Sequence, residues 1–334
     1  MREGICVAGN LIVDILYPIE SYPGKSELTT ITNGIARSTG GAACNVTMDL
    51  ASLDPNLPLS VIGILGEDTE ADFVAGQFEK YKNIDISNIK RKGVTSFTAV
   101  MCENTTKART FFHYRGANAI LSEEDFNWKS INSRILHIGY ILLLDVLDQP
   151  DEEYGTKMAR LLAKTQKEGI KTSIDVVSEV GNRFERLVPP ALKYVDYCII
   201  NELETQQATK IPLRGEDGAL LEENMKPALE KLFSMGVSTW AVIHAPEGGF
   251  GMDKSGQMIR VKSLELPAGY IKGTVGAGDA FCAGVLFAAY QNVDLQQAIV
   301  MGIASAACSL SQPGSTEGMK TMKEALSLYD SLKK

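Results

Sequence analysis

Short runs of apolar residues alternate with longer amphipathic segments along most of the chain. The apolar runs are too short for helices and predict buried strands at residues 5–8, 60–64, 135–138, 171–175, 197–200 and 240–244. Between them, apolar side chains recur at helical spacing in residues 153–169, 224–236 and 321–332. This alternation predicts a mostly parallel sheet covered by helices on both faces, formed by residues 1–334 as a single α/β domain.

Two segments break this alternation, at about residues 17–39 and 95–116. The first is polar and rich in Thr, Ser, Gly and Pro, and the second alternates like a hairpin around a polar turn at residues 104–107. We interpret both as a small antiparallel flap inserted into the larger domain. Surface excursions without any role as a lid are the alternative.

Composition and charge argue against several classes of partner. The net charge is −8 and the longest basic run is the KRK of residues 90–92, which disfavours nucleic acids and membrane surfaces as partners. The six cysteines are scattered without a C-x-x-C pair, which indicates reduced thiols rather than a disulfide frame or a zinc site. No apolar run approaches the ~18 residues of a membrane span, so we expect a cytoplasmic protein.

A glycine-rich segment, GTVGAGDAFCAG at residues 273–284, precedes a stretch that is otherwise typical of a buried helix. The start of a helix offers free N–H groups and the positive end of the macrodipole, and glycines let an anion approach closely. Asp279 would lie beside such an anion, where a carboxylate can accept a proton from an attacking hydroxyl. The alternative is an ordinary glycine turn with Asp279 as a helix cap.

A second glycine pair leads into a helix at residues 38–53, STGGAACNVTMDLASL, and Asp14 lies just beyond the first strand. Ligands bind at the carboxyl ends of strands in open α/β sheets. With these motifs the chain resembles the PfkB (ribokinase-like) family of sugar and nucleoside kinases. The resemblance runs nearly end to end, from VAGNLIVD through GGAACN and INELE to GTVGAGD, and implies a ribokinase-like three-layer sandwich with a small antiparallel β lid.

The resemblance also implies roles for individual residues in the transfer of a phosphoryl group. Asp279 would be the general base, beside an anion hole formed by the backbone amides of Gly276, Ala277 and Gly278. The residues expected to hold the acceptor are Asp14, Gly40, Gly41 and Asn45. Arg115, which follows the flap, would meet the acceptor or a phosphate, or would lie at the surface.

The resemblance further implies a site for ATP and Mg²⁺. Asn201 and Glu204 match an N-x-x-E element that orders magnesium, with Glu204 acting through water. The same two residues also fit a helix capping box, and both roles can hold at once. Other residues expected near the nucleotide are His244, Gly249, Thr274 and Ser309.

Two departures from the family pattern matter. Gly273 stands where the family usually has an aspartate that often belongs to a monovalent-cation site, which puts potassium activation in doubt. Residues near Ala42, Tyr140 and 142–144 make the expected acceptor walls more apolar. This weakens the case for ribose and leaves room for a nucleoside, a cyclitol or a deoxy sugar.

We therefore expect an ATP- and magnesium-dependent kinase that phosphorylates a hydroxyl of a small sugar. A nucleoside or cyclitol kinase of the same family is the alternative, and a sugar-binding sensor without turnover is an alternative of another class. A vitamin kinase of the superfamily, which generally lacks a flap, would gain support if residues 95–116 were helical. The unpaired strand edges of the flap favour a homodimer formed through the lid.

Overall fold

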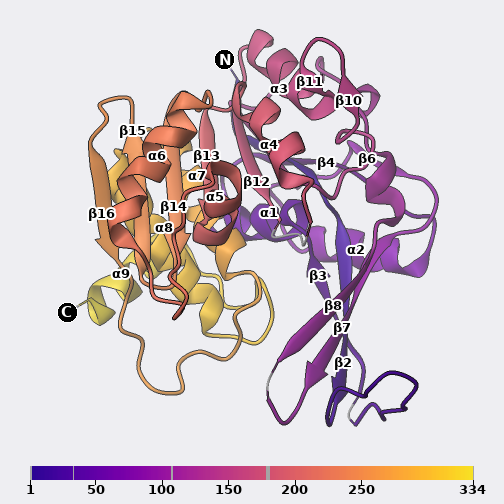
Figure 1. Ribbon diagram of the computed structural model, residues 1–334. Coiled ribbons are helices and arrows are strands. Elements are labelled where there is room, and N and C mark those ends of the chain that lie inside the picture. The colour runs from indigo at the N-terminus through magenta and orange to yellow at the C-terminus, as the bar shows by residue number, and fades with distance from the viewer. Residues whose placement is uncertain (1, 33, 107, 178–180, 334) are drawn as a thin grey trace.

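A central sheet runs through the protein (Figure 1), a computed structural model that describes residues 2–32, 34–106, 108–177 and 181–333. In these residues ten strands form the sheet, nine of them in the order β16-β15-β14-β13-β12-β9-β1-β4-β5, with β6 pairing with β4. Pairing is parallel from β14 to β5, and β15 and β16 add an antiparallel edge. The strands are β1 (Ile5–Gly9), β4 (Leu59–Leu65), β5 (Ile84–Asp85), β6 (Ile89–Arg91), β9 (Ile135–Ile141), β12 (Lys171–Val176), β13 (Tyr197–Asn201), β14 (Trp240–Ala245), β15 (Gly248–Asp253) and β16 (Met258–Lys262).

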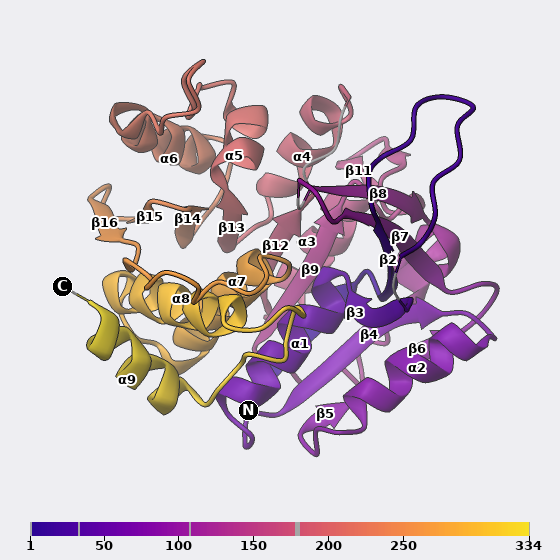
Figure 2. The same cartoon turned by 90° about the horizontal axis from the view of Figure 1, so that it is seen from below.

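Helices cover both faces of this sheet, which gives the expected three layers (Figure 2). One face carries α1 (Ala42–Leu53), α2 (Thr69–Phe78), α7 (Ala277–Gln291), α8 (Leu295–Leu310) and α9 (Met322–Leu332). The other face carries α3 (Lys157–Lys167), α4 (Phe184–Leu192), α5 (Glu202–Thr209) and α6 (Met225–Ser234). Short 3₁₀ turns lie at η1 (Gly116–Ile120), η2 (Glu123–Asp125) and η3 (Glu222–Asn224).

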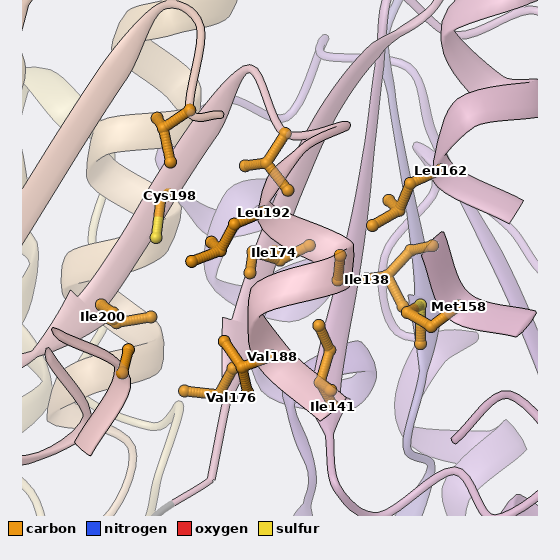
Figure 3. Packing of buried hydrophobic residues seen from close by; sticks show 14 of the residues in the cluster. Ile138, Ile141, Met158, Leu162, Ile174, Val176, Val188, Leu192, Cys198 and Ile200 are labelled. Atoms are coloured by element: carbon orange, nitrogen blue, oxygen red, sulfur yellow. The ribbon is translucent and has the colours of Figure 1, made fainter. Parts of the chain in front are cut away.

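The core lies in two layers, one on each face of the sheet. Figure 3 shows part of the layer beneath α3 and α4, where Met158 and Leu192 pack on Ile138 and Ile174. These strands are buried on both faces, which is why they read in the sequence as continuous apolar runs rather than alternating ones.

A second, smaller sheet forms the lid and projects from the body (Figure 1). Its strand order is β3 (Ala36–Gly40), β2 (Ile12–Ile19), β7 (Ser96–Glu103) and β8 (Arg109–Tyr114). The two outer pairings are antiparallel as expected, but the central pairing of β2 with β7 is parallel. The vitamin-kinase alternative loses its support, because residues 96–103 and 109–114 are strands.

The sequence misjudged several boundaries. The lid begins at Ile12 rather than near residue 17, because only two residues separate the end of β1 from the start of β2. The helix predicted over residues 153–169 starts only at Lys157, since β10 (Pro150–Asp151) and β11 (Gly155–Thr156) form a hairpin before it. The polar turn predicted at residues 104–107 ends at Lys107, which lies outside the described residues.

The structure also bears on the cysteines and on membrane spans. All six thiols are free, and five of them are buried. None of the helices in the described part of the chain is long and apolar enough to cross a membrane.

Candidate active site

A cavity of about 580 Å³ lies between the lid and the body, at the carboxyl end of the parallel strands. Both parts of the molecule contribute to its walls. The lid supplies Asp14, Thr98 and His113, and the body supplies Asn45, Tyr140, Gly276 and Asp279. The start of α7 therefore faces the cavity that holds Asp14 and Asn45, as the sequence predicted.

Asp279 is the buried carboxylate at the base of this cavity. Its Oδ2 accepts a hydrogen bond from the Asn45 amide at 2.8 Å, and its Oδ1 accepts one from the Tyr140 hydroxyl at 2.8 Å. Burial raises the pKa of Asp279, while these two hydrogen bonds lower it. Asp279 forms no cap hydrogen bond at the start of α7, so the helix-cap alternative is wrong.

Asn45 is oriented by a residue that the sequence analysis did not single out. The Ser315 hydroxyl donates to Asn45 Oδ1 at 3.1 Å and also lies 3.2 Å from the Thr39 carbonyl oxygen. With its oxygen engaged by Ser315, the Asn45 amide presents its nitrogen to Asp279. Asn45 lies inside α1 rather than at its cap, which is Gly41.

The turn before α7 depends on glycine. Gly276 is the N-cap of α7 and has a left-handed conformation with φ of 80°, and a Cβ there would lie 2.6 Å from the Ser315 carbonyl oxygen. The following amides of Ala277 and Gly278 belong to the first turn, where helices leave N–H groups without an acceptor. The turn can therefore receive an anion.

A smaller cavity of about 260 Å³ adjoins this turn. Its walls include Asp175, Asn201, Glu204 and Asp279. Asn201 and Glu204 form the expected capping box of α5, in which Asn201 Oδ1 accepts from the Glu204 amide at 2.8 Å. Asp175, at the end of β12, was missed because nothing in its local sequence distinguishes it.

These acidic side chains suit an indirectly bound divalent cation. Burial, followed by the charges of Glu204 and Asp279, raises the pKa of Asp175. A cation between such carboxylates would relieve their repulsion, and Mg²⁺ prefers oxygen ligands while keeping several waters. No three His, Cys, Asp or Glu side chains among the described residues are grouped to hold a metal directly.

A third cavity, of about 450 Å³, extends from the start of α7 away from the lid. The candidates that line it are His244, Thr274, Ala277 and Gly278, beside an apolar surface from α8. The His244 ring lies 5.0 Å from that of Phe281, and burial lowers its pKa to about 4. His244 is therefore neutral near pH 7.

Two nucleotide candidates do not line this third cavity. Gly249 is packed against Ile299 of α8, and its neighbour Gly248 lines the cavity instead. Ser309 is buried with its hydroxyl 3.2 Å from the Ser315 carbonyl oxygen, while Ala306 and Ala307 face the cavity. Gly249 was predicted from its position in a loop that contacts the nucleotide in the family, and Ser309 from the small size of the residues around it. Neither signal reveals the face of the element on which a residue lies.

The remaining acceptor candidates are close to the first cavity. Gly41 and Arg115 line it. Gly40 is next to Asp14, since a Cβ at residue 40 would lie 2.4 Å from an Asp14 carboxylate oxygen. Arg115 also forms an ion pair with Asp145 at 3.2 Å.

A row of polar side chains crosses the inner face of the lid. Asp14 is directly opposite Thr98 of β7, and Thr98 is opposite His113 of β8, at 3.1 Å from Thr98 Oγ1 to His113 Nδ1. The pKa of Asp14 is raised to about 6, because burial outweighs the lowering effect of a hydrogen bond from Thr98. Thr98 and His113 were not among the predicted site residues, because their register against β2 joins distant parts of the chain.

Comparison with known proteins agrees with this geometry. The family model of pfkB family carbohydrate kinases matches residues 2–322. The chain belongs to the pfkB family of carbohydrate kinases. The expected enzyme class, an ATP-dependent carbohydrate kinase, is confirmed at the level of this family.

Two individual pfkB relatives are distant but span nearly the whole chain. A nucleoside kinase of Methanocaldococcus jannaschii is 23% identical over 96% of this chain and 94% of its own length. A 5-dehydro-2-deoxygluconokinase of Bacillus licheniformis is also 23% identical, with the same two coverages.

Solved structures share the fold of this pfkB kinase. A ribokinase of Thermotoga maritima superimposes with a TM-score of 0.79 at 19% identity, covering 98% of this chain and 99% of its own. A ribokinase of Arabidopsis thaliana, solved with ribose and ATP, gives 0.77 at 20% identity with the same coverages. The ribokinase-like fold is thereby confirmed.

Proposed function

We propose that this protein transfers the γ-phosphoryl group of ATP to a hydroxyl of a small sugar, with Asp279 as the general base. The observation that carries the proposal is that Asp279 and Gly276 line both the acceptor cavity and the adjoining acidic cavity. An acceptor hydroxyl beside Asp279 would therefore face a phosphate at the start of α7.

In the proposed reaction the acceptor oxygen forms a bond to the γ-phosphorus as the bond to the ADP oxygen breaks. The hydroxyl proton passes to Asp279, and the amides of Gly276, Ala277 and Gly278 stabilise charge on the transferring group. Asp14 and Asn45 hold acceptor hydroxyls. Closure of the lid would exclude water and so limit hydrolysis of ATP.

Mg²⁺ would be held near Asn201, Glu204 and Asp175, with Glu204 acting through water. A bound Mg²⁺ supplies positive charge to the β- and γ-phosphate oxygens. Potassium activation remains doubtful in the proposal, because Gly273 lacks the carboxylate of the usual aspartate.

A nucleoside, cyclitol or deoxy sugar is the second candidate acceptor. Apolar side chains form part of the acceptor cavity, namely Ile12, Phe111, Leu143, Val177 and Val275. Such a wall suits an acceptor with fewer hydroxyls or with a flat base. Tyr140, by contrast, is not simply apolar, since its hydroxyl binds Asp279.

The decisive experiment measures ADP formation with a panel of sugars, nucleosides and cyclitols, in the presence of ATP and Mg²⁺, with and without K⁺. For an acceptor that is turned over, D279N should lower kcat by about 10²- to 10⁴-fold while ADP binds as tightly as to the wild type. Wild-type turnover by a folded D279N variant would refute Asp279 as the base. Ligand-induced thermal shifts without ADP formation from any acceptor would favour the sensor.

We also propose that two copies pair through the lid. Phe111, Phe112 and Tyr114 on β8 are 58%, 50% and 47% exposed, and β3 and β8 are the edges of the lid sheet. Pairing would cover both the apolar side chains and the unpaired strand edges. Light scattering should give the mass of a dimer at micromolar concentration for the wild type and of a monomer for F112D, whereas a monomeric wild type would exclude this pairing.

A further inference from the structure

Three charged side chains from separate parts of the chain meet beside the third cavity, which we call the nucleotide cavity because His244 and Thr274, expected near the nucleotide, line it. Arg214 lies in the loop after α5, Glu202 is the first residue of α5, and Glu247 is in the turn between β14 and β15. Arg214 donates to Glu202 Oε1 from Nε at 3.1 Å and from Nη2 at 2.6 Å. Its Nη1 and Nη2 donate to Glu247 at 2.5 and 3.0 Å.

Arg214 and Glu202 are better shielded than an ordinary surface ion pair, while Glu247 is 39% exposed. The side chain of Arg214 is 17% exposed and that of Glu202 is 9% exposed, whereas Arg260 and Glu222, which also pair, are 39% and 40% exposed. Paired, two-pronged contacts of a guanidinium with carboxylates fix geometry as well as charge. The cluster therefore holds α5, the loop after it and the β14–β15 turn in one arrangement.

The turn fixed in this way is part of the wall of the nucleotide cavity. Pro246 and Gly248, on either side of Glu247, both line the cavity, as does Glu202 itself. The turn is also tied to the strand beyond it, because the Ser263 amide donates to the Glu247 carbonyl oxygen at 3.0 Å. Arg214 thus sets the position of a wall that it does not itself form.

Glu202 has a carboxylate oxygen available to a ligand. Both contacts of Glu202 with Arg214 use Oε1, and no hydrogen bond from a residue that the structure describes reaches Oε2. A carboxylate only accepts hydrogen bonds, and the three side chains together carry one net negative charge. This wall therefore suits an O–H or N–H donor and disfavours a phosphate.

Resting on the proposed function, we propose that Arg214 is a positioning residue for the nucleotide and that Glu202 recognises a donor group on it. Arg214 holds Glu202 and the turn at residues 246–248 against the nucleoside part of ATP. Glu202 Oε2 accepts a hydrogen bond from a ribose hydroxyl or from the amino group of the base.

The first test measures binding of ADP in the presence of Mg²⁺ by calorimetry, which needs no knowledge of the acceptor. R214M should weaken binding by about 10- to 100-fold, the size expected when a charge-assisted contact is lost. The control R260M removes an exposed Arg–Glu pair outside the cavity and should leave the Kd unchanged. With any acceptor that is turned over, R214M should raise the KM for ATP without changing kcat or the acceptor KM.

The second test identifies the donor group by removing it from the ligand. The three analogues are 2′-deoxy-ADP and 3′-deoxy-ADP, which each lack one ribose hydroxyl, and IDP, which lacks the amino group of the base. Wild type should bind one of these analogues more weakly than it binds ADP. E202A should bind that analogue and ADP with the same Kd. The assignment of Glu202 as the hydrogen-bond acceptor therefore does not depend on R214M alone. Thermal unfolding of each variant verifies that it is folded.

The outcomes separate the inference from the proposed function. Equal binding of ADP by wild type and a folded R214M would overturn the positioning role and leave the kinase proposal intact. Equal binding of ADP and all three analogues by wild type would overturn donor recognition by Glu202. A wild type that does not bind ADP at all would overturn the proposed function and this inference with it.

Discussion

The hydroxyl of Tyr140 is expected to set the pH range in which Asp279 can act as a base. Tyr140 donates to Asp279 Oδ1 at 2.8 Å from a partly buried position, and burial raises the pKa of Tyr140 itself well above its usual value, so it remains a donor. A hydrogen bond to a charged group contributes about 1.5–3 kcal/mol, and one pKa unit corresponds to about 1.4 kcal/mol. Removing this donor in Y140F should therefore raise the pKa of Asp279 by about one to two units.

The direction of the effect on activity follows from the role of Asp279. The base must be ionised, so kcat/KM falls as the pH drops through the pKa of Asp279, and a raised pKa moves this acid limb upward. We expect the acid limb of Y140F to lie about one to two pH units above that of the wild type. The control Y114F makes the same chemical change on the exposed side of the lid and should leave the profile unaltered.

A second measurement of the same variant needs no acceptor. In urea unfolding, the stability difference between wild type and Y140F should be larger when Asp279 is ionised than when it is protonated, because the hydrogen bond is strongest to the charged form. An acid limb that stays in place, together with a stability difference that is independent of pH, would refute the reasoning.

Two further predictions concern other buried titratable groups. Asp49 is fully buried, neither carboxylate oxygen has a partner among the described residues, and burial raises its pKa well above 3.8. As the pH rises above 3.8, wild type should therefore lose up to about 1.4 kcal/mol of stability per pH unit until the folded-state pKa of Asp49 is reached. Urea unfolding at several pH values should show a smaller loss per pH unit in D49N. Burial lowers the pKa of His113 to about 4, so its ring is neutral at pH 7. The variant H113F should raise the acceptor KM by about 3- to 10-fold with the KM for ATP unchanged, and T110V, an exposed change on the same strand, serves as control. Equal acceptor KM values for H113F and wild type would show that His113 does not contact the acceptor.

The sequence predicted the body of the fold well because its signals are local. Strands β9 and β13 are buried on both faces, so their apolar runs stand out from the amphipathic helices between them. The glycine turn before α7 is also a local signal, because three glycines lie at or just before the start of an otherwise apolar helix. The family resemblance predicted that Asp279, Gly276 and Asn45 lie together, and these three residues line one cavity.

What the sequence could not supply depends on contacts between distant residues. Tyr140 lies in an apolar run, so the direction of its hydroxyl toward Asp279 could not be foreseen. Thr98 reaches the acceptor cavity only through its register with β2, more than 80 residues earlier. The choice of Ser309 failed because helical phase, rather than residue size, decides which side chains of α8 face the cavity.

The short connection between β1 and β2 couples binding of the acceptor to the position of the lid. Only Asn10 and Leu11 separate a central strand of the body from the strand of the lid that carries Asp14. An acceptor held by Asp14 on one side and by Asn45 and Asp279 on the other would contact both the lid and the body, which this two-residue connection joins. Binding of the acceptor would bring the lid and the body closer together, so the acceptor itself would select the conformation in which it can receive a phosphoryl group.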